Sequence, residues 1–253
     1  MLMPKKRRRR RRGGGKAARV LSVLLAAVVI VAALTLFFKV EEIEVTGCRR
    51  YTPEEVAIIT QVEKGDNLIL LDRFRVKQRI FEELPYVSEV RVGRRLPDTL
   101  VVEITETGAA AAVESGGAWW LLSKSGKVLE MVEEAQAAEY LLLENLTVEP
   151  PAVSSRLAVS EESPLTAERL TELMEELDKR DMLTRADSID AGDPDQLVIS
   201  YDGRFRVEIF YDADFPYKLD SLRKVVEALQ PNETGIIRMN MQADNEVRFI
   251  PDA

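Results

Sequence analysis

The sequence predicts an α+β protein in which a single N-terminal transmembrane helix is followed by two folded domains. Three observations predict this class: an apolar run follows a basic N-terminal segment, helical and strand-like hydrophobic periods then alternate, and hydrophobic residues make up 46% of the 253 residues. We expect a basic tail at 1–19, a transmembrane helix at 20–38, a first domain at 39–106, and a second α+β domain with a mainly antiparallel sheet at 107–253.

The apolar run at 20–38 contains no charged residue, and only Ser22 and Thr35 are polar. As a helix it is about 28 Å long, close to the thickness of a bilayer's hydrocarbon core. A cleaved signal peptide is the alternative, but its apolar region is usually about 7–15 residues long and ends in a small-residue cleavage site, which is not evident here. The run therefore favours an uncleaved transmembrane helix.

The basic tail at 1–19 carries ten lysines and arginines and no acidic residue, although the whole chain has a net charge of −8. Basic residues beside a transmembrane segment keep that end in the cytoplasm, so we expect a single-pass protein of the cell membrane with its domains outside. Contact with anionic lipids is compatible with this topology. Nucleic-acid binding or nuclear import is the alternative role, and we expect no nucleic-acid partner. The topology-determining residues are Arg7, Arg8, Arg9, Arg10, Arg11 and Arg12.

The composition excludes several kinds of catalytic site. The chain has no histidine and one cysteine, Cys48, so it lacks Ser-His-Asp triads, internal disulfides and multi-thiolate metal sites. Neither a nucleotide-binding glycine loop nor a Gly-x-Ser-x-Gly elbow is present. We therefore expect a protein that is not an enzyme and uses no cofactor.

The first domain reads as strand, helix, helix, strand, strand. A strand at 39–45 alternates apolar and acidic residues, and a helix begins at Thr52 with Pro53 and Glu55 in its first turn. Asp72 caps a second helix, and strands follow at 87–94 and 100–105. The apolar side chains that recur at helical spacing in the second helix are Phe74, Ile80, Phe81 and Leu84.

Several short motifs of this region resemble the POTRA domain of the FtsQ/DivIB cell-division proteins. They are IEVTG, the TPEE helix start, GDNL before LLD, PYVSEVRV, and RRLPDTL followed by VEITE. The resemblance implies a POTRA domain at 39–106, directly after the membrane helix. The sequence TETGAAAAV replaces the acidic, arginine and proline residues that the family often shows next, which implies a looser hinge between the domains.

The second domain begins with strands and hairpins. A weakly alternating segment at 109–122 leads into a hairpin at Ser125-Gly126, and a further strand is expected at 140–146 before the loop at Pro150-Pro151. Trp119 and Trp120 are adjacent, so in a strand they point to opposite faces. We expect one of them in the core, and the other packed at the surface or contacting a partner.

The rest of the second domain contains two amphipathic helices and a hairpin at Asp202-Gly203. The first helix is expected to begin at Ser163-Pro164, the second covers 215–229, and two short strands follow. The sequences KLDSL, GIIRMNM and VRFIP resemble the β domain of the same family, whereas 131–185 matches it poorly. The residues expected to face the core are Leu170, Leu173, Met174, Leu177, Leu219, Leu222, Val225, Val226 and Leu229.

Four aspartates, Asp187, Asp190, Asp193 and Asp195, lie close together in the sequence. Such a cluster can bind Ca²⁺ or supply an acid–base pair, which leaves a membrane-anchored carboxylate-type hydrolase or a metal-binding extracytoplasmic protein as the alternative function. The spacing and closing glutamate of an EF-hand loop are absent, and Asp, Gly and Pro are common turn residues. We therefore interpret the cluster as a turn.

The family resemblance implies a non-enzymatic bitopic scaffold at the division septum. Its implied partners are bitopic proteins of the FtsL and FtsB/DivIC types, acting with the septal peptidoglycan synthase complex. In the family the small partner adds a strand to an edge late in the β domain. The matching strands here are 237–242 and 247–249, and strand alternation leaves open which side chains face outward. The candidate partner-binding residues are Ile237, Met239, Met241, Val247 and Phe249.

Overall fold

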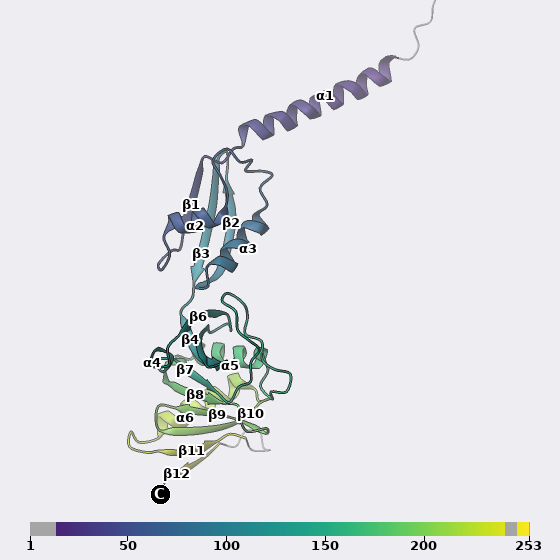
Figure 1. Cartoon of the computed structure of the whole chain (residues 1–253). Helices are drawn as coiled ribbons and strands as arrows, with labels where there is room; N and C mark the ends of the chain where they lie inside the picture. Colours follow the sequence, from purple (N-terminus) through teal and green to yellow (C-terminus); the bar gives the residue numbers. More distant parts are fainter. Residues whose placement is uncertain (1–13, 241–246, 253) are drawn as a thin grey trace, which may run out of the picture.

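The computed structural model describes residues 14–240 and 247–252. Three groups of elements follow one another (Figure 1): helix α1, a three-stranded sheet with two helices, and a nine-stranded sheet with three helices. The arginines at 7–12 and Met241 lie outside the described residues, so the topology expected from those arginines stays a prediction.

Helix α1 comprises Gly14–Phe37, which agrees with the helix expected at 20–38. Its large apolar side chains between Val20 and Val31 are 58–68% exposed. Within the part of the chain that the structure describes, no helix has both the length and the hydropathy of a membrane span. The transmembrane role of 20–38 therefore remains a prediction.

The first domain has the expected β-α-α-β-β order. β1 (Glu42–Thr46) pairs in parallel with β3 (Thr99–Glu106), and β3 pairs antiparallel with β2 (Val87–Arg95). Helices α2 (Pro53–Thr60) and α3 (Arg73–Glu83) contact each other, α2 contacts β1, and α3 contacts β2. β3 is therefore the central strand, and its residues Leu100, Val102 and Ile104 are buried in the core of this domain.

The helix starts of the first domain are as predicted. Thr52 Oγ1 accepts from Glu55 N–H (3.2 Å), and the Glu55 carboxylate accepts from Thr52 N–H (2.8 Å), which forms a capping box. Asp72 Oδ1 accepts from the N–H groups of Phe74 (3.0 Å) and Arg75 (3.2 Å). These bonds connect residues two or three positions apart, so local sequence is sufficient to specify them.

Phe74, although it belongs to the apolar set that recurs at helical spacing with Ile80, does not face the core. Its side chain is 73% exposed, whereas Val76 and Ile80 are buried. Val76 and Ile80 are four residues apart and share one helix face. Phe74 precedes Val76 by two residues, about 200° around the helix, and so lies on the opposite side.

The second domain contains one mixed sheet in the order β12-β11-β10-β9-β8-β7-β4-β5-β6. Five of its eight pairings are antiparallel, and the pairs β4–β7, β7–β8 and β10–β11 are parallel. The sheet is therefore mainly antiparallel, as expected. Its strands are β4 (Ala109–Ser115), β5 (Ala118–Ser123), β6 (Val128–Val132), β7 (Leu141–Glu144), β8 (Ala186–Asp190), β9 (Gln196–Tyr201), β10 (Phe205–Phe210), β11 (Gly235–Arg238) and β12 (Arg248–Pro251).

Helices α5 (Ala167–Lys179) and α6 (Phe215–Ala228) contribute to the main core of this domain. As predicted, α5 buries Leu170, Leu173, Met174 and Leu177. A short helix, α4 (Glu134–Ala137), belongs to a second apolar cluster, in which Tyr86 of the first domain also takes part. The sheet thus has a helix-covered core and a separate cluster near the first domain.

Two local expectations need correction. α5 is capped by Thr166, whose hydroxyl accepts from Arg169 N–H (3.3 Å), and it does not begin at Ser163-Pro164. Ser163 Oγ instead accepts from Leu165 N–H (3.3 Å) in the preceding loop. The aspartate segment is not only a turn, because Ala186–Asp190 forms β8 between β7 and β9.

Candidate partner-binding surfaces

β12 is the outermost strand at the end of the sheet far from α1 (Figure 1). β11 lies between β10, with which it pairs in parallel, and β12, with which it pairs antiparallel. Both backbone sides of β11 are therefore occupied. This changes the expectation for 237–242: β11 is an inner strand, and the free edge is β12.

The backbone groups of β12 that face away from the sheet follow from its hydrogen bonds. Asp252 N–H donates to Thr234 O (3.0 Å). In an antiparallel pair the inward groups recur at every second residue, so those of Ile250 and Arg248 also face β11. The N–H and C=O of Phe249 therefore face outward, where an added strand can bind them.

The structure also decides which side chains near this edge face the core. Ile237 and Met239 are fully buried, so they are not available for side-chain contact in this conformation. Phe249 is half-buried and makes an edge-to-face contact with Phe205, with ring centroids 6.1 Å apart. Val247 is also half-buried and packs on the main core. Of the members of the predicted set that the structure describes, Val247 and Phe249 are those that a partner strand can still reach.

The other face of the same edge is basic. Arg238 Nε donates to Glu208 Oε2 (2.8 Å), and Arg206 Nε lies 3.6 Å from Glu208 Oε1. Arg248 is exposed and lies opposite Arg238 in the strand register. Two guanidinium groups, those of Arg206 and Arg238, therefore contact one nearly buried carboxylate, and Arg248 adds a third positive charge beside them. A strand added at β12 meets excess positive charge, which favours acidic side chains on the partner.

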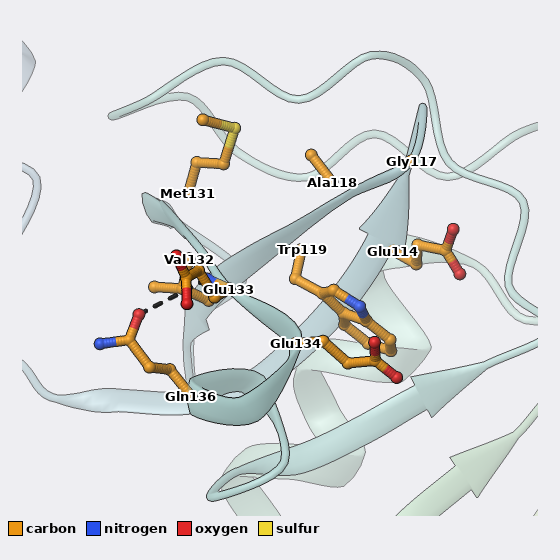
Figure 2. Close-up of a pocket in the computed structure, with 9 residues that line it drawn as sticks. All are labelled: Glu114, Gly117, Ala118, Trp119, Met131, Val132, Glu133, Glu134 and Gln136. Carbon is orange, nitrogen blue, oxygen red and sulfur yellow. Dashed lines mark hydrogen bonds between the residues drawn. The ribbon is translucent and has the colours of Figure 1, made fainter.

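A second surface lies at the opposite end of the sheet, around β5, β6 and α4. An open groove there has a volume of about 970 Å³. In Figure 2 the side chain of Trp119 lies close to Glu114 and Glu134, and Met131 lies on a neighbouring strand. As predicted, the two tryptophans separate: Trp119 packs with the cluster near the first domain, and Trp120 packs on the main core. With three glutamates on its rim, the groove is unsuited to an anionic partner.

Aspartates of the cluster accept hydrogen bonds from nearby backbone and side-chain N–H groups. Asp190 Oδ1 accepts from Gly192 N–H (2.8 Å) and from the Asn145 side-chain amide (2.7 Å), and Asp187 accepts from Gly203 N–H (2.7 Å). Across 14–240 and 247–252, no three acidic or thiol side chains are placed to hold a metal ion. The carboxylates are thus used in strand ends and turns.

The two domains are joined around Lys127, which the sequence did not single out. Its ammonium group is buried and donates to three carbonyls at the end of α3 and the start of β2. The acceptors are Phe81 O (2.8 Å), Leu84 O (3.1 Å) and Val87 O (3.0 Å). These bonds cross from one domain to the other and satisfy carbonyls at a helix C-terminus, where a cation is favoured.

Further contacts strengthen this joint. Tyr86 Oη donates to Glu130, and the Arg50 guanidinium lies 3.8 Å from the centre of the Tyr86 ring. Within the first domain, burial would raise the pKa of Glu106 at the end of β3, but N–H groups of Arg49, Arg50 and Tyr51 donate to this carboxylate and lower its pKa. The looser hinge implied by TETGAAAAV is therefore not what the contacts show.

We expect stability to rise with pH between about 8 and 10 because of Lys127. Burial lowers the pKa of Lys127 from 10.5 to about 8 in the folded chain. Between these two pKa values the unfolded chain binds more protons than the folded chain, so raising the pH increases the free energy of unfolding. We expect an increase of about 1–2 kcal/mol, which is less than the whole pKa shift would give, because the three carbonyls favour the charged form of Lys127. Urea unfolding at pH 7, 8, 9 and 10 measures this rise, which should vanish in Lys127→Met.

The joint offered no recognisable signal in the sequence. Lys127 follows the Ser125-Gly126 turn, where an exposed lysine is ordinary, and its acceptors are backbone atoms more than 39 residues away. Tyr86 and Glu130 are likewise 44 residues apart. Only the folded chain brings these groups together.

Comparison with known proteins places the first domain in a family. Residues 38–107 match the family "POTRA domain, FtsQ-type". The cell division protein FtsQ of Corynebacterium glutamicum is 37% identical over 89 residues, which cover 35% of this chain and 40% of that protein. FtsQ of Geotalea daltonii is 27% identical over 210 residues, covering 78% of this chain and 70% of that protein.

Proteins named DivIB are also similar to the chain. DivIB of Clostridium tetani is 21% identical over 217 residues, covering 85% of this chain and 80% of that protein. The solved major extracytoplasmic domain of DivIB from Geobacillus stearothermophilus matches with a TM-score of 0.32 and 16% identity, covering 51% of this chain and 98% of that domain. The matches to several relatives span less than half of those proteins' lengths.

Proposed function

We infer that this chain, a member of the FtsQ/DivIB family of bacterial cell-division proteins, is a non-enzymatic scaffold of the division septum. The helix at 20–38 anchors it in the cell membrane with the N-terminus in the cytoplasm, and the two domains lie outside. Its partners are bitopic proteins of the FtsL and FtsB/DivIC types, through which it acts with the septal peptidoglycan synthase complex. The aspartates do not support the hydrolase alternative, because Asp190 accepts from Gly192 in its own loop and Asp187 accepts from Gly203 in the turn between β9 and β10.

The observation that carries this proposal is the free edge of β12. The backbone of Phe249 faces outward, Arg248 is exposed beside it, and the sheet behind both is held by the main core. Main-chain hydrogen bonds to an added strand supply affinity, and alternate side chains supply specificity. We therefore expect an extended, acidic segment of the FtsB/DivIC-type partner to bind here.

Arg248→Glu is expected to weaken capture of the FtsB/DivIC-type partner by about tenfold, because it places a carboxylate opposite an acidic strand. Arg248 is exposed, so the variant should fold normally. The full chain in nanodiscs is titrated with the extracytoplasmic segment of the partner, and binding is followed by fluorescence anisotropy.

Arg91→Glu is the matched control, because Arg91 is also an exposed strand arginine, on β2 of the first domain. It should bind as the unchanged chain does. Equal affinities for the Arg248 and Arg91 variants would argue against strand addition at β12.

A further inference from the structure

The end of the first domain next to α1 exposes large apolar side chains from three separate segments. We call this set, Ile69, Leu70, Phe74 and Leu96, the tip. The exposed fractions are 37%, 73%, 73% and 58% in that order. Apolar side chains gathered on one end of a small domain indicate a contact surface.

Local hydrogen bonds hold the tip residues in this exposed arrangement. Asn67 Oδ1 accepts from the N–H groups of Ile69 and Leu70, both at 2.9 Å, while Leu68 between them is fully buried. Asp72 caps α3 and thereby fixes the first turn that contains Phe74. Hydrogen bonds within the loop and the helix cap therefore fix these side chains in exposed positions.

The tip is bonded directly to the segment that leaves α1. Leu68 N–H donates to Phe38 O (2.9 Å), and Val40 N–H donates to Asp66 O (2.8 Å). Glu41 N–H donates to Asp98 O (2.9 Å), two residues after Leu96. No flexible spacer separates α1 from the domain, so the depth of Phe38 in a bilayer determines the position of the tip.

We propose that the tip inserts its apolar side chains into the boundary between lipid headgroups and acyl chains. The occupant is lipid because the apolar surface of α1 continues into the tip: Phe37, the last residue of α1, is 68% exposed, and Leu70 is two residues from the bond to Phe38. Such a boundary accepts apolar side chains beside basic ones that extend toward the headgroups, as Arg73 and Arg75 can.

This inference rests on the proposed membrane anchor, and it deepens it. If α1 were the single point of contact with the bilayer, α1 and the domain bonded to it could still rotate and tilt together. Insertion of the tip adds a second point of contact and restricts that rotation. The orientation of the β12 edge relative to the membrane is then limited to a narrow range, which suits a partner that is itself anchored in the same membrane.

The test uses nitroxide labels on the full chain in nanodiscs. Cys48 is the only cysteine, so Cys48→Ser provides a background for Leu70→Cys, Phe74→Cys, Val29→Cys and Met131→Cys. Accessibility to oxygen, which concentrates in lipid, is compared with accessibility to a water-soluble nickel chelate. We expect the labels at 29, 70 and 74 to favour oxygen, and the label at 131, an exposed apolar position of the second domain, to favour nickel severalfold.

Each outcome distinguishes the two proposals. If the label at 29 reports lipid while those at 70 and 74 report water, the proposed membrane anchor is supported and lipid contact by the tip is overturned. If the label at 29 also reports water, both the proposed membrane anchor and the proposed lipid contact of the tip are overturned. Spectra broadened by label–label contact at 70 or 74 would assign the tip to a second copy of the chain and overturn the lipid proposal.

Discussion

Arg169→Ala is expected to lower the free energy of unfolding by about 2–3 kcal/mol, because Arg169 ties α5 to the loop between β10 and α6. Its guanidinium donates to Tyr211 O (3.0 Å) and Ala213 O (2.5 Å) and lies 3.9 Å from the centre of the Phe215 ring. The substitution removes these two hydrogen bonds, the ion pair with Glu172 and a cation–π contact together. Urea unfolding followed by circular dichroism measures the loss.

Arg169→Lys separates charge from geometry. Lysine keeps the positive charge near Phe215, but it cannot present the planar fork that reaches two carbonyls at once, so we expect about half of the loss. Arg223→Ala is the matched control, because its exposed guanidinium lies 3.8 Å from Asp220 and does little for stability. A full loss in Arg223→Ala, or none in Arg169→Ala, would contradict this account.

The elements that the sequence predicted well depend on residues close together in the chain. The capping box at Thr52, the cap at Asp72 and the hairpin turn at Asp202-Gly203 each need contacts or positive φ angles within four residues. The inner face of α5 also follows from a helical period alone. Local patterns therefore specify most of the helices and hairpins.

Features that depend on distant pairing could not be predicted in the same way. The family resemblance indicated a late strand edge, but it did not show that β11 pairs with β10 in parallel and so becomes an inner strand. Strand alternation allowed Ile237 and Met239 to face either the core or the solvent. Only their packing in the main core, to which α6 also contributes, decides between the two. The exposure of Phe74 depends likewise on which face of α3 meets the sheet.

Gly235→Ala is expected to displace β12 and to lower the free energy of unfolding by about 2–4 kcal/mol. Gly235 has φ +153°, and a Cβ atom there would lie 2.2 Å from Ile250 O and 2.9 Å from Pro251 Cα. Both atoms belong to the backbone of β12, so no side-chain rotation can relieve the clash. Hydrogen exchange should show lost protection of the Ile250 and Asp252 amides, and partner capture should fall with it.

Gly203→Ala is the control that separates strain from collision. Gly203 also has a positive φ, +62°, but nothing lies within 4 Å of its added Cβ, so only the conformational penalty of about 1 kcal/mol remains. Partner capture should survive that change. Arg248→Glu alters the charge of the edge and leaves its position intact, whereas Gly235→Ala moves the edge and leaves its charges intact. If strand addition at β12 is the binding mode, both variants must lose partner capture. Loss in Arg248→Glu alone would mean that the partner recognises the charge of the edge without pairing to the strand.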